Sequence, residues 1–287
     1  MAKRQQDKVR SLRAISANPG IRAAYRRVIR SMIRAMREDY GRKLSALYEQ
    51  LEWRIAADSS GPWKSPLQRM TEALDTLAGK WSARFAAFSE KAAPRMVKDV
   101  LKRVSKSRLS SLEEAGVKPP LKDMDLASRV SDRRVQTLIE ANVALIRSIP
   151  KECHQRVAKL LTQAVSSQMS HEKLAEAIAK DFGVTERRAD LIARDQVLKA
   201  TQSMAQAADA ELGITEGIWI HVPGRKSSRP THVKMDGKKF TLTTGLWDSA
   251  VNRWVKTGEL INCACKYRPV VPESWTGSKT YGQAVYE

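Results

Sequence analysis

At 287 residues, the chain is long enough to bury a substantial core and to divide into two domains. Three cysteines are too few for the disulfide framework of a small secreted protein. No apolar run approaches the roughly 20 residues of a membrane-spanning helix, and the first residues lack the apolar core of a signal peptide. We therefore expect no membrane partner and synthesis in a reducing cytoplasm.

The positive charge is concentrated in the first part of the chain. Residues 1–110 hold 25 basic and 10 acidic residues, whereas residues 111–287 hold 26 and 21. Such an excess favours a polyanionic partner, with nucleic acid first and an acidic protein surface or lipid headgroups as alternatives. The other interpretation is a basic helical surface that only aids solubility.

Apolar residues at helical spacing predict one long helix over residues 21–57. Its opposite face carries the candidate contacts for DNA or an acidic partner, namely Arg22, Arg26, Arg27, Arg30, Arg34 and Arg37. After a loop at residues 58–66, we expect helices at 67–92 and 95–115, with Pro94 ending or kinking the first of them. The second of these also has a basic outer face, with Lys98, Lys102, Arg103 and Lys106. Gly116 is a natural C-cap.

A pair of prolines, Pro119 and Pro120, marks the first predicted domain boundary. Residues 1–116 would form a basic helical N-terminal domain, and residues 117–212 a helical stalk. We expect the stalk helices to end at Pro150, at residue 167 and at Gly183, and the last to run from Thr185 to Gly213.

Residues 213–287 are predicted to form a small α+β unit followed by a tail. "GIWIHV" alternates as a strand does, "KKFTL" and "CKYRPVV" read as further short strands, and residues 223–232 read as a loop. The tryptophans are expected to anchor cores, although Trp53, Trp63 and Trp81 in the basic domain could instead stack on nucleobases. The predicted fold class is mainly α with this small C-terminal α+β unit: long basic amphipathic helices, a helical stalk, then short antiparallel strands.

A series of short motifs runs through the second half of the chain. They are Ala193-Arg194-Asp195-Gln196, Gly213-Ile214, Trp219, Arg229, His232, Asp236-Gly237, Asn262-Cys263, Cys265 and Pro269. In order and spacing they resemble the phage Mu F-like head morphogenesis proteins, also called minor head proteins, over roughly residues 126–287. The chain departs from that pattern in two places. The loop before Arg229 lacks the usual Asp, and Ala264 replaces the usual Arg between the cysteines.

The resemblance implies a structural protein of a tailed-phage virion, present in low copy near the portal vertex and acting in head assembly or genome delivery. Its implied partners are the portal protein and other capsid or neck proteins, and no catalytic role follows. The basic helices would add nonspecific contact with double-stranded DNA. The alternatives are a DNA-binding accessory protein delivered with the genome, or a metal-dependent enzyme acting on nucleic acid.

Three interpretations compete for the residues around His232. In one, His232, Cys263 and Cys265 bind a structural zinc ion with His221 or Asp236 as the fourth ligand, although C-x-C is tighter than the usual C-x₂₋₄-C spacing. In another, His232 and Asp236 are catalytic. We favour a structural role, with no cofactor. The motif residues expected to be structural are Arg194, Asp195, Gln196, Arg229, Asp236, Gly237 and Asn262.

In that structural interpretation, Asp236-Gly237 forms a turn, and Asn262 caps another. His232 and Arg229 would hydrogen-bond to loop carbonyls or to a neighbouring acid. The two cysteines would share one strand face and point into a small core, where free cysteine behaves as a compact hydrophobe.

Overall fold

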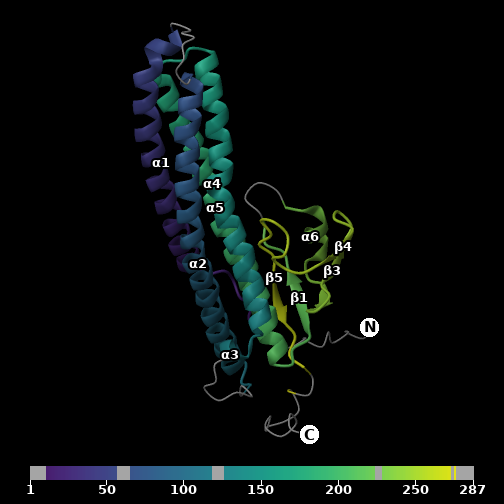
Figure 1. Ribbon diagram of the computed structural model, residues 1–287. Coiled ribbons are helices and arrows are strands. Elements are labelled where there is room, and N and C mark those ends of the chain that lie inside the picture. Colours follow the sequence, from purple (N-terminus) through teal and green to yellow (C-terminus); the bar gives the residue numbers. More distant parts are fainter. Residues whose placement is uncertain (1–10, 57–64, 118–125, 224–227, 273–274, 276–287) are drawn as a thin grey trace. The chain divides into compact units, whose positions relative to one another are not determined.

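The computed structural model describes residues 11–56, 65–117, 126–223, 228–272 and 275 (Figure 1). The expected loop at 58–64, the proline pair and the tail beyond residue 275 lie outside the described residues. The elements are α1 (Pro19–Ala56), α2 (Pro66–Glu114), α3 (Leu126–Arg129), α4 (Asp132–Ser166), α5 (His171–Glu211), β1 (Glu216–Ile220), α6 (Pro230–Met235), β2 (Lys239–Thr241), β3 (Leu246–Asp248), β4 (Arg253–Val255) and β5 (Lys266–Pro269). The predicted fold class is confirmed. None of the described helices is both long and apolar enough to cross a membrane.

By its internal contacts the chain forms two compact units. We call residues 23–95 and 139–193 the helical unit, and residues 1–22, 96–138 and 194–287 the mixed unit. Helices α2, α4 and α5 each supply residues to both. The division expected from the sequence, at residues 116 and 212, stays a prediction.

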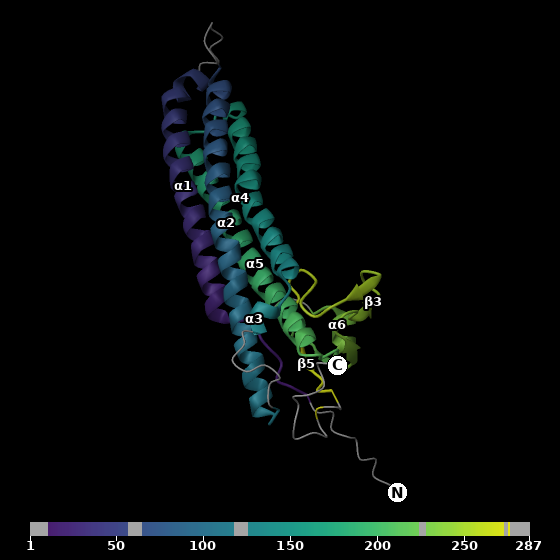
Figure 2. The same ribbon diagram turned by 60° about the horizontal axis from the view of Figure 1, so that its bottom comes forward.

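The helical unit is built from α1, α2, α4 and α5, which run side by side in both ribbon views (Figures 1 and 2). Buried side chains recur every three or four positions along α1, as the apolar pattern predicts: Tyr25, Ile29, Ile33, Met36, Tyr40, Leu44, Tyr48 and Leu51. Several polar groups inside this core are hydrogen-bonded, although the Tyr40 hydroxyl has no hydrogen-bond partner among the described residues. The Tyr25 hydroxyl donates to Asn142 Oδ1 at 3.1 Å, and the buried Asp39 carboxylate accepts from Lys80 Nζ at 2.5 Å and Trp81 Nε1 at 3.0 Å.

The predicted helix breaks at Pro94, Pro150 and Gly183 are wrong, because α2, α4 and α5 continue through them. Buried residues keep their helical spacing across each position: Ala93, Met96 and Val97; Ile149 and Cys153; Phe182 and Thr185. A proline removes one backbone hydrogen bond, and an internal glycine costs roughly 1 kcal/mol relative to alanine. Burial of a continuous apolar face outweighs both costs here.

The predicted C-caps at Gly116 and Gly213 are confirmed. Both glycines have positive φ, +70° and +75°. The next amide reaches back five residues in each case, from Val117 to the Leu112 carbonyl at 2.9 Å and from Ile214 to the Asp209 carbonyl at 2.8 Å. This is the Schellman arrangement, in which glycine avoids the steric cost of a left-handed backbone. It ends α2 and α5 where the sequence indicates.

The mixed unit contains a three-stranded antiparallel sheet in the order β2-β1-β5, and a separate hairpin of β3 and β4. The three strands predicted from the sequence form the larger sheet. The hairpin was not predicted, and α6 occupies part of the segment expected to be a loop. Arg229-Pro230 explains α6, because proline at the first helical position is pre-organised for a helix start. The N-terminal segment extends the sheet, since Leu12 N–H donates to the Pro269 carbonyl at 2.9 Å.

A fully buried ion pair lies at the centre of the mixed unit. The Arg108 and Asp209 side chains have no exposed surface, and they contact through Nε–Oδ1 at 2.5 Å and Nη2–Oδ2 at 3.0 Å. Arg108 Nη1 also donates to the Arg13 carbonyl at 3.0 Å, and the Tyr267 hydroxyl donates to Asp209 Oδ2 at 2.5 Å. Burial raises the pKa of Asp209, and Arg108 and Tyr267 oppose that rise. One ion pair thus ties together α2, α5, β5 and the N-terminal segment.

The tryptophans divide into two groups. Trp81, Trp219 and Trp275 are buried, as expected of core anchors. The expectation is wrong for Trp247 and Trp254, which are 49% and 53% exposed. These two pair edge-to-face across β3 and β4, with ring centroids 6.0 Å apart. The side chains of residues 53 and 63 lie outside the described part of the structure.

Candidate metal centre

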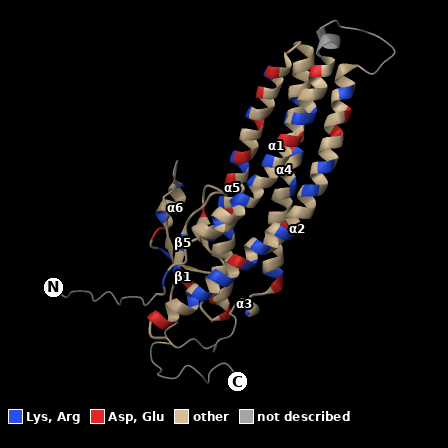
Figure 3. Cartoon of the chain, turned by 90° about the vertical axis from the view of Figure 1, so that its left-hand side faces the viewer, with Lys and Arg blue, Asp and Glu red and all other residues tan. Residues whose placement is uncertain are grey.

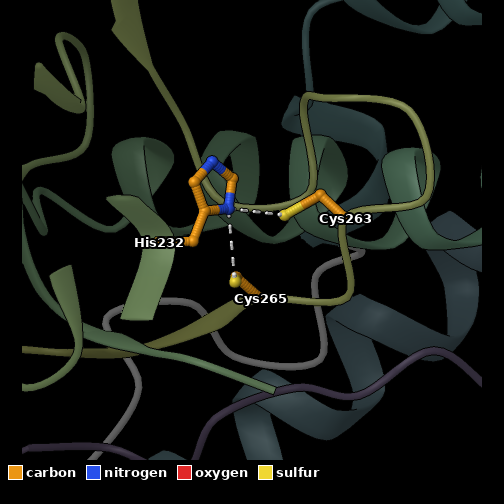
Figure 4. Close-up of side chains that lie close together, drawn as sticks. All are labelled: His232, Cys263 and Cys265. Atoms are coloured by element: carbon orange, nitrogen blue, oxygen red, sulfur yellow. Dashed lines mark hydrogen bonds between the residues drawn. The ribbon is translucent and has the colours of Figure 1, made fainter. Parts of the chain in front are cut away.

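Three of the residues singled out from the sequence come together inside the mixed unit. His232 projects from α6, while Cys263 and Cys265 lie in the loop before β5 (Figure 4). His232 Nδ1 is 3.5 Å from Cys263 Sγ and 3.6 Å from Cys265 Sγ. All three side chains are buried. The sequence suggested that both cysteines lie in a strand, but they precede β5. Both sulfurs nevertheless point toward the His232 imidazole.

His221 lies beside this group of three and contacts one of its members. It follows β1, and its Nδ1 lies 3.6 Å from Cys265 Sγ. Its Nε2 lies 3.1 Å from Ser228 Oγ. The sequence offered His221 and Asp236 equally as a fourth ligand, and the structure separates them. Asp236 is exposed and its Oδ1 accepts a hydrogen bond from the His221 backbone N–H at 2.8 Å, so this carboxylate positions the histidine.

Asp248, at the end of β3, is the one residue of the cluster that sequence reasoning missed. Its Oδ2 lies 3.1 Å from His232 Nε2, and its Oδ1 accepts from the Ala250 backbone N–H at 3.0 Å. The Asp248 side chain is fully buried. No local pattern marks this aspartate, because the contact joins two elements that the sequence does not pair.

The electrostatics of the cluster favour a thiolate. A hydrogen bond from the Cys265 thiol, with the neighbouring His232, lowers the pKa of Cys263 to about 4 despite burial. The same hydrogen bond, together with burial, raises the pKa of Cys265. Burial lowers the pKa of His232, but Cys263 and Asp248 outweigh it and the net change is upward. Two thiols and two imidazoles at this separation can hold a cation, or one thiol can serve as a nucleophile.

The motif residues of α5 fasten the loop that carries Cys263. Asp195 Oδ1 accepts from the Asn262 backbone N–H at 2.5 Å, and Arg194 Nη2 donates to Asn262 Oδ1 at 2.7 Å. Arg229 Nη2 donates to the Ile261 carbonyl at 2.9 Å. Asn262 has φ +60°, a left-handed conformation that asparagine adopts more readily than most residues. These contacts fix where the loop turns immediately before the first cysteine.

The remaining motif residues also bind the backbone or one another. Gln196 Nε2 donates to Asp195 Oδ2 at 3.0 Å. Gly237, with φ +74°, donates its N–H to the Trp219 carbonyl at 2.9 Å and leads the chain into β2. The Trp219 ring packs edge-on against His232, with centroids 5.5 Å apart. Most of the motif residues therefore contact the cluster or a segment that carries one of its members.

Residues 155–268 match the family model described as Phage Mu protein F like protein. This part of the chain is Mu F-like. A protein of Haemophilus influenzae described as uncharacterized is 32% identical over 139 residues, which are 48% of this chain and 30% of that protein. The chain thus matches about a third of the length of this relative. No solved structure gives a significant match.

The Mu F-like segment contains all four members of the cluster and all the motif residues from Arg194 to Asn262. Helices α1 and α2 lie outside the match. Any role for their basic residues must therefore be argued from the structure alone.

Half of the arginines proposed as partner contacts on α1 are already paired within the helical unit. Arg26 contacts Asp190 at 2.8 Å, and Arg30 and Arg37 contact Glu186 at 3.0 and 3.9 Å. Arg22, Arg27 and Arg34 are exposed, and none of the three has an ion pair among the described residues. The α1 face thus offers less free positive charge than its sequence indicates.

The C-terminal half of α2 carries a second basic surface, which we call the α2 patch. Lys98, Lys102, Arg103 and Lys106 are all exposed on this helix. Figure 3 colours the lysine and arginine positions of α2 and the other elements blue. Within the described residues, no carboxylate forms an ion pair with any of them. Asp99 is the acidic residue closest to them in the sequence. The α2 patch therefore retains its charge in the folded chain.

Proposed function

We propose that the chain is a structural minor capsid protein of a tailed bacteriophage, located near the portal vertex of the virion and acting in head assembly or genome delivery. The observation that carries this proposal is the Mu F-like match over residues 155–268. The proposed partners are the portal protein and other capsid or neck proteins.

The arrangement of the motif residues supports a structural role over a catalytic one. Their hydrogen bonds end on backbone groups and on one another, which is the pattern of a scaffold that holds loops in place. The cavity beside His232 has a volume of only about 30 Å³. This is the volume of one or two water molecules, far below the roughly 300 Å³ or more of a typical ligand pocket.

Purified phage particles test this proposal. We expect mass spectrometry of particles from a host carrying the phage to detect the chain, and a stop codon early in its gene to reduce the yield of filled heads. A plasmid copy should restore that yield. Particles that lack the chain, together with normal heads from the stop-codon phage, would refute the structural assignment.

We also propose that the α2 patch makes nonspecific contact with double-stranded DNA. Four unpaired cations on about three turns of one helix can each neutralise a phosphate and release a counterion. The paired arginines of α1 would have to give up Asp190 or Glu186 first. Binding through the patch would show little sequence preference, because phosphates carry no base information.

Charge reversal with a matched control tests the DNA contact in the full-length chain. We expect replacement of Lys98, Lys102, Arg103 and Lys106 by Glu to abolish binding to a random duplex in fluorescence anisotropy. The control replaces Lys151, Lys159, Lys173 and Lys180 by Glu. These four are also exposed and belong to the helical unit, so the net charge changes equally.

The salt dependence separates phosphate contact from other modes of binding. For the wild type, log K should fall against log salt with a slope of roughly 0.9 for each neutralised phosphate. Equal loss of affinity in both variants, or an affinity independent of salt, would contradict a DNA contact at the α2 patch. Salt-sensitive co-sedimentation of the patch with portal rings, without any DNA binding, would assign it to an acidic protein surface instead.

A further inference from the structure

We propose that His221, His232, Cys263 and Cys265 bind one structural zinc ion inside the mixed unit. Zinc in a tetrahedral site lies about 2.3 Å from sulfur and 2.0–2.1 Å from nitrogen, which places neighbouring nitrogen and sulfur ligands about 3.6 Å apart. His232 Nδ1 lies 3.5 and 3.6 Å from the two sulfurs, and His221 Nδ1 lies 3.6 Å from Cys265 Sγ. The donor atoms of His232, Cys263 and Cys265 therefore already lie together as zinc ligands do, within 4.8 Å of one another, and His221 approaches this group at Cys265.

The second nitrogen of each histidine supports this assignment. Both rings direct Nδ1 toward the sulfurs, while His232 Nε2 faces Asp248 and His221 Nε2 faces Ser228. A histidine that binds zinc usually donates its other ring N–H to a carboxylate or another acceptor, which fixes the ring and strengthens the ligand. Asp248 is thus a positioning residue, a buried carboxylate that faces this imidazole and the backbone N–H of Ala250.

The tight C-x-C spacing, which argued against zinc in the sequence, is explained by the local backbone. Asn262 is left-handed, and its N–H and side chain are held by Asp195 and Arg194. The chain therefore turns sharply just before Cys263. Because the cysteines lie in this loop and not on a regular strand, both sulfurs reach the same imidazole nitrogen without additional intervening residues.

A Cys263–His232–Asp248 catalytic triad is the main alternative, since a thiol, a base and an orienting carboxylate follow one another here. Cys263 is only 3% exposed, and the adjoining cavity of about 30 Å³ has room for an ion but not for a substrate. A triad would also leave Cys265 and His221 without a function. A zinc ion uses all four donors.

Four protein ligands make the site structural, because a catalytic zinc keeps an open position for water or substrate. The ion would join the end of β1, α6 and the loop before β5. These segments are short, with α6 spanning six residues and β5 four, so they can bury little apolar surface by themselves. The free energy of metal binding would then contribute directly to folding.

Metal analysis of the full-length chain, purified without an affinity tag or chelator, tests the proposal. We expect one zinc per chain, and we expect Co²⁺ reconstitution to give the visible absorption and thiolate charge-transfer bands of a tetrahedral site. Cys263→Ser, Cys265→Ser and His221→Ala should lose the metal. Cys153→Ser is the matched control, because this buried thiol belongs to the helical unit, and it should keep one zinc. Asp248→Asn should bind zinc roughly 10–100-fold more weakly in a chelator competition.

If the variants do not fold, measurements on the wild-type protein alone still test the proposal. Stripping the metal with a chelator should lower the melting temperature, and adding Zn²⁺ should restore it. A folded wild type that contains no zinc and gives no Co²⁺ spectrum would overturn the proposal. Retention of one zinc with an unchanged Co²⁺ spectrum in His221→Ala would overturn the four-ligand assignment. Rapid, stoichiometric alkylation of Cys263 in the native protein would favour the triad.

Discussion

Replacing Arg108 by methionine would leave the Asp209 carboxylate buried without its counter-charge. Both side chains are fully buried, and the guanidinium contacts the carboxylate through two nitrogen–oxygen pairs. Removing one partner of a buried ion pair costs about 3–5 kcal/mol, because the remaining charge loses both water and its partner. The Arg13 carbonyl would lose its donor as well. We therefore expect Arg108→Met to lower the free energy of unfolding by about 3–5 kcal/mol.

Urea denaturation with a double-variant cycle measures this effect. Combining Arg108→Met with Asp209→Leu removes both charges, so the double variant should be less destabilised than the sum of the single variants, with a coupling near the upper end of the usual 0.5–3 kcal/mol. Arg147→Met is the control, because its 2.6 Å ion pair with Glu90 is more than half exposed and should contribute no more than about 1 kcal/mol. If Arg108→Met destabilised no more than this control, the pair would not hold the mixed unit together.

Three further predictions concern other parts of the chain. Burial raises the pKa of Asp39, but hydrogen bonds from Lys80 and Trp81 and the charges of Lys80 and Lys43 outweigh it and hold this pKa below its ordinary value of 3.8. Stability from this group is present above pH 3.8 and lost below it, so Asp39→Asn should flatten the fall in unfolding free energy between pH 5 and pH 2. Gly245→Ala should lower the stability by well over 1 kcal/mol in thermal melts, because Gly245 has φ +88° and a Cβ there would lie 2.1 Å from a β4 carbonyl oxygen. The control Gly79→Ala, in an open position on α2, should stabilise the protein by up to about 1 kcal/mol. Equal effects of the two substitutions would contradict the described hairpin. Asp195→Ala should free the loop around Asn262, because Asp195 accepts a hydrogen bond from the Asn262 backbone N–H. In the metal-free protein, the cysteine thiols should then react faster with a disulfide reagent. An unchanged rate would show that the loop does not depend on this carboxylate.

The helices could be predicted from the sequence because their signal is local. Buried residues recur along α1 at the spacing that the sequence displays, and glycines with positive φ end α2 and α5 where expected. The errors at Pro94 and Pro150 have a physical origin. A proline is a local breaking signal, while the burial that carries α2 and α4 past it comes from contacts with other helices.

The sequence predicted which residue types form the candidate site, but not which of these residues contact one another. The sequence identifies His232, Cys263 and Cys265, yet it cannot choose between His221 and Asp236, which are equally plausible from their positions along the chain. The choice depends on which atom each residue turns toward the sulfurs, and Asp236 binds a backbone amide instead. No local sequence pattern predicts that Asp248 contacts His232. The same holds for the acidic residues of α5 that form ion pairs with the α1 arginines.

The pairing of the N-terminal segment with the last strand constrains biosynthesis. Leu12 and Ile15 are buried in the mixed unit, and Ser11 bridges to Val270. While the ribosome translates the intervening 250 or so codons, these early side chains have no partner strand and stay accessible to chaperones and proteases. A nascent chain released before β5 emerges would keep this segment without its partner strand, so the cell could recognise and remove incomplete products.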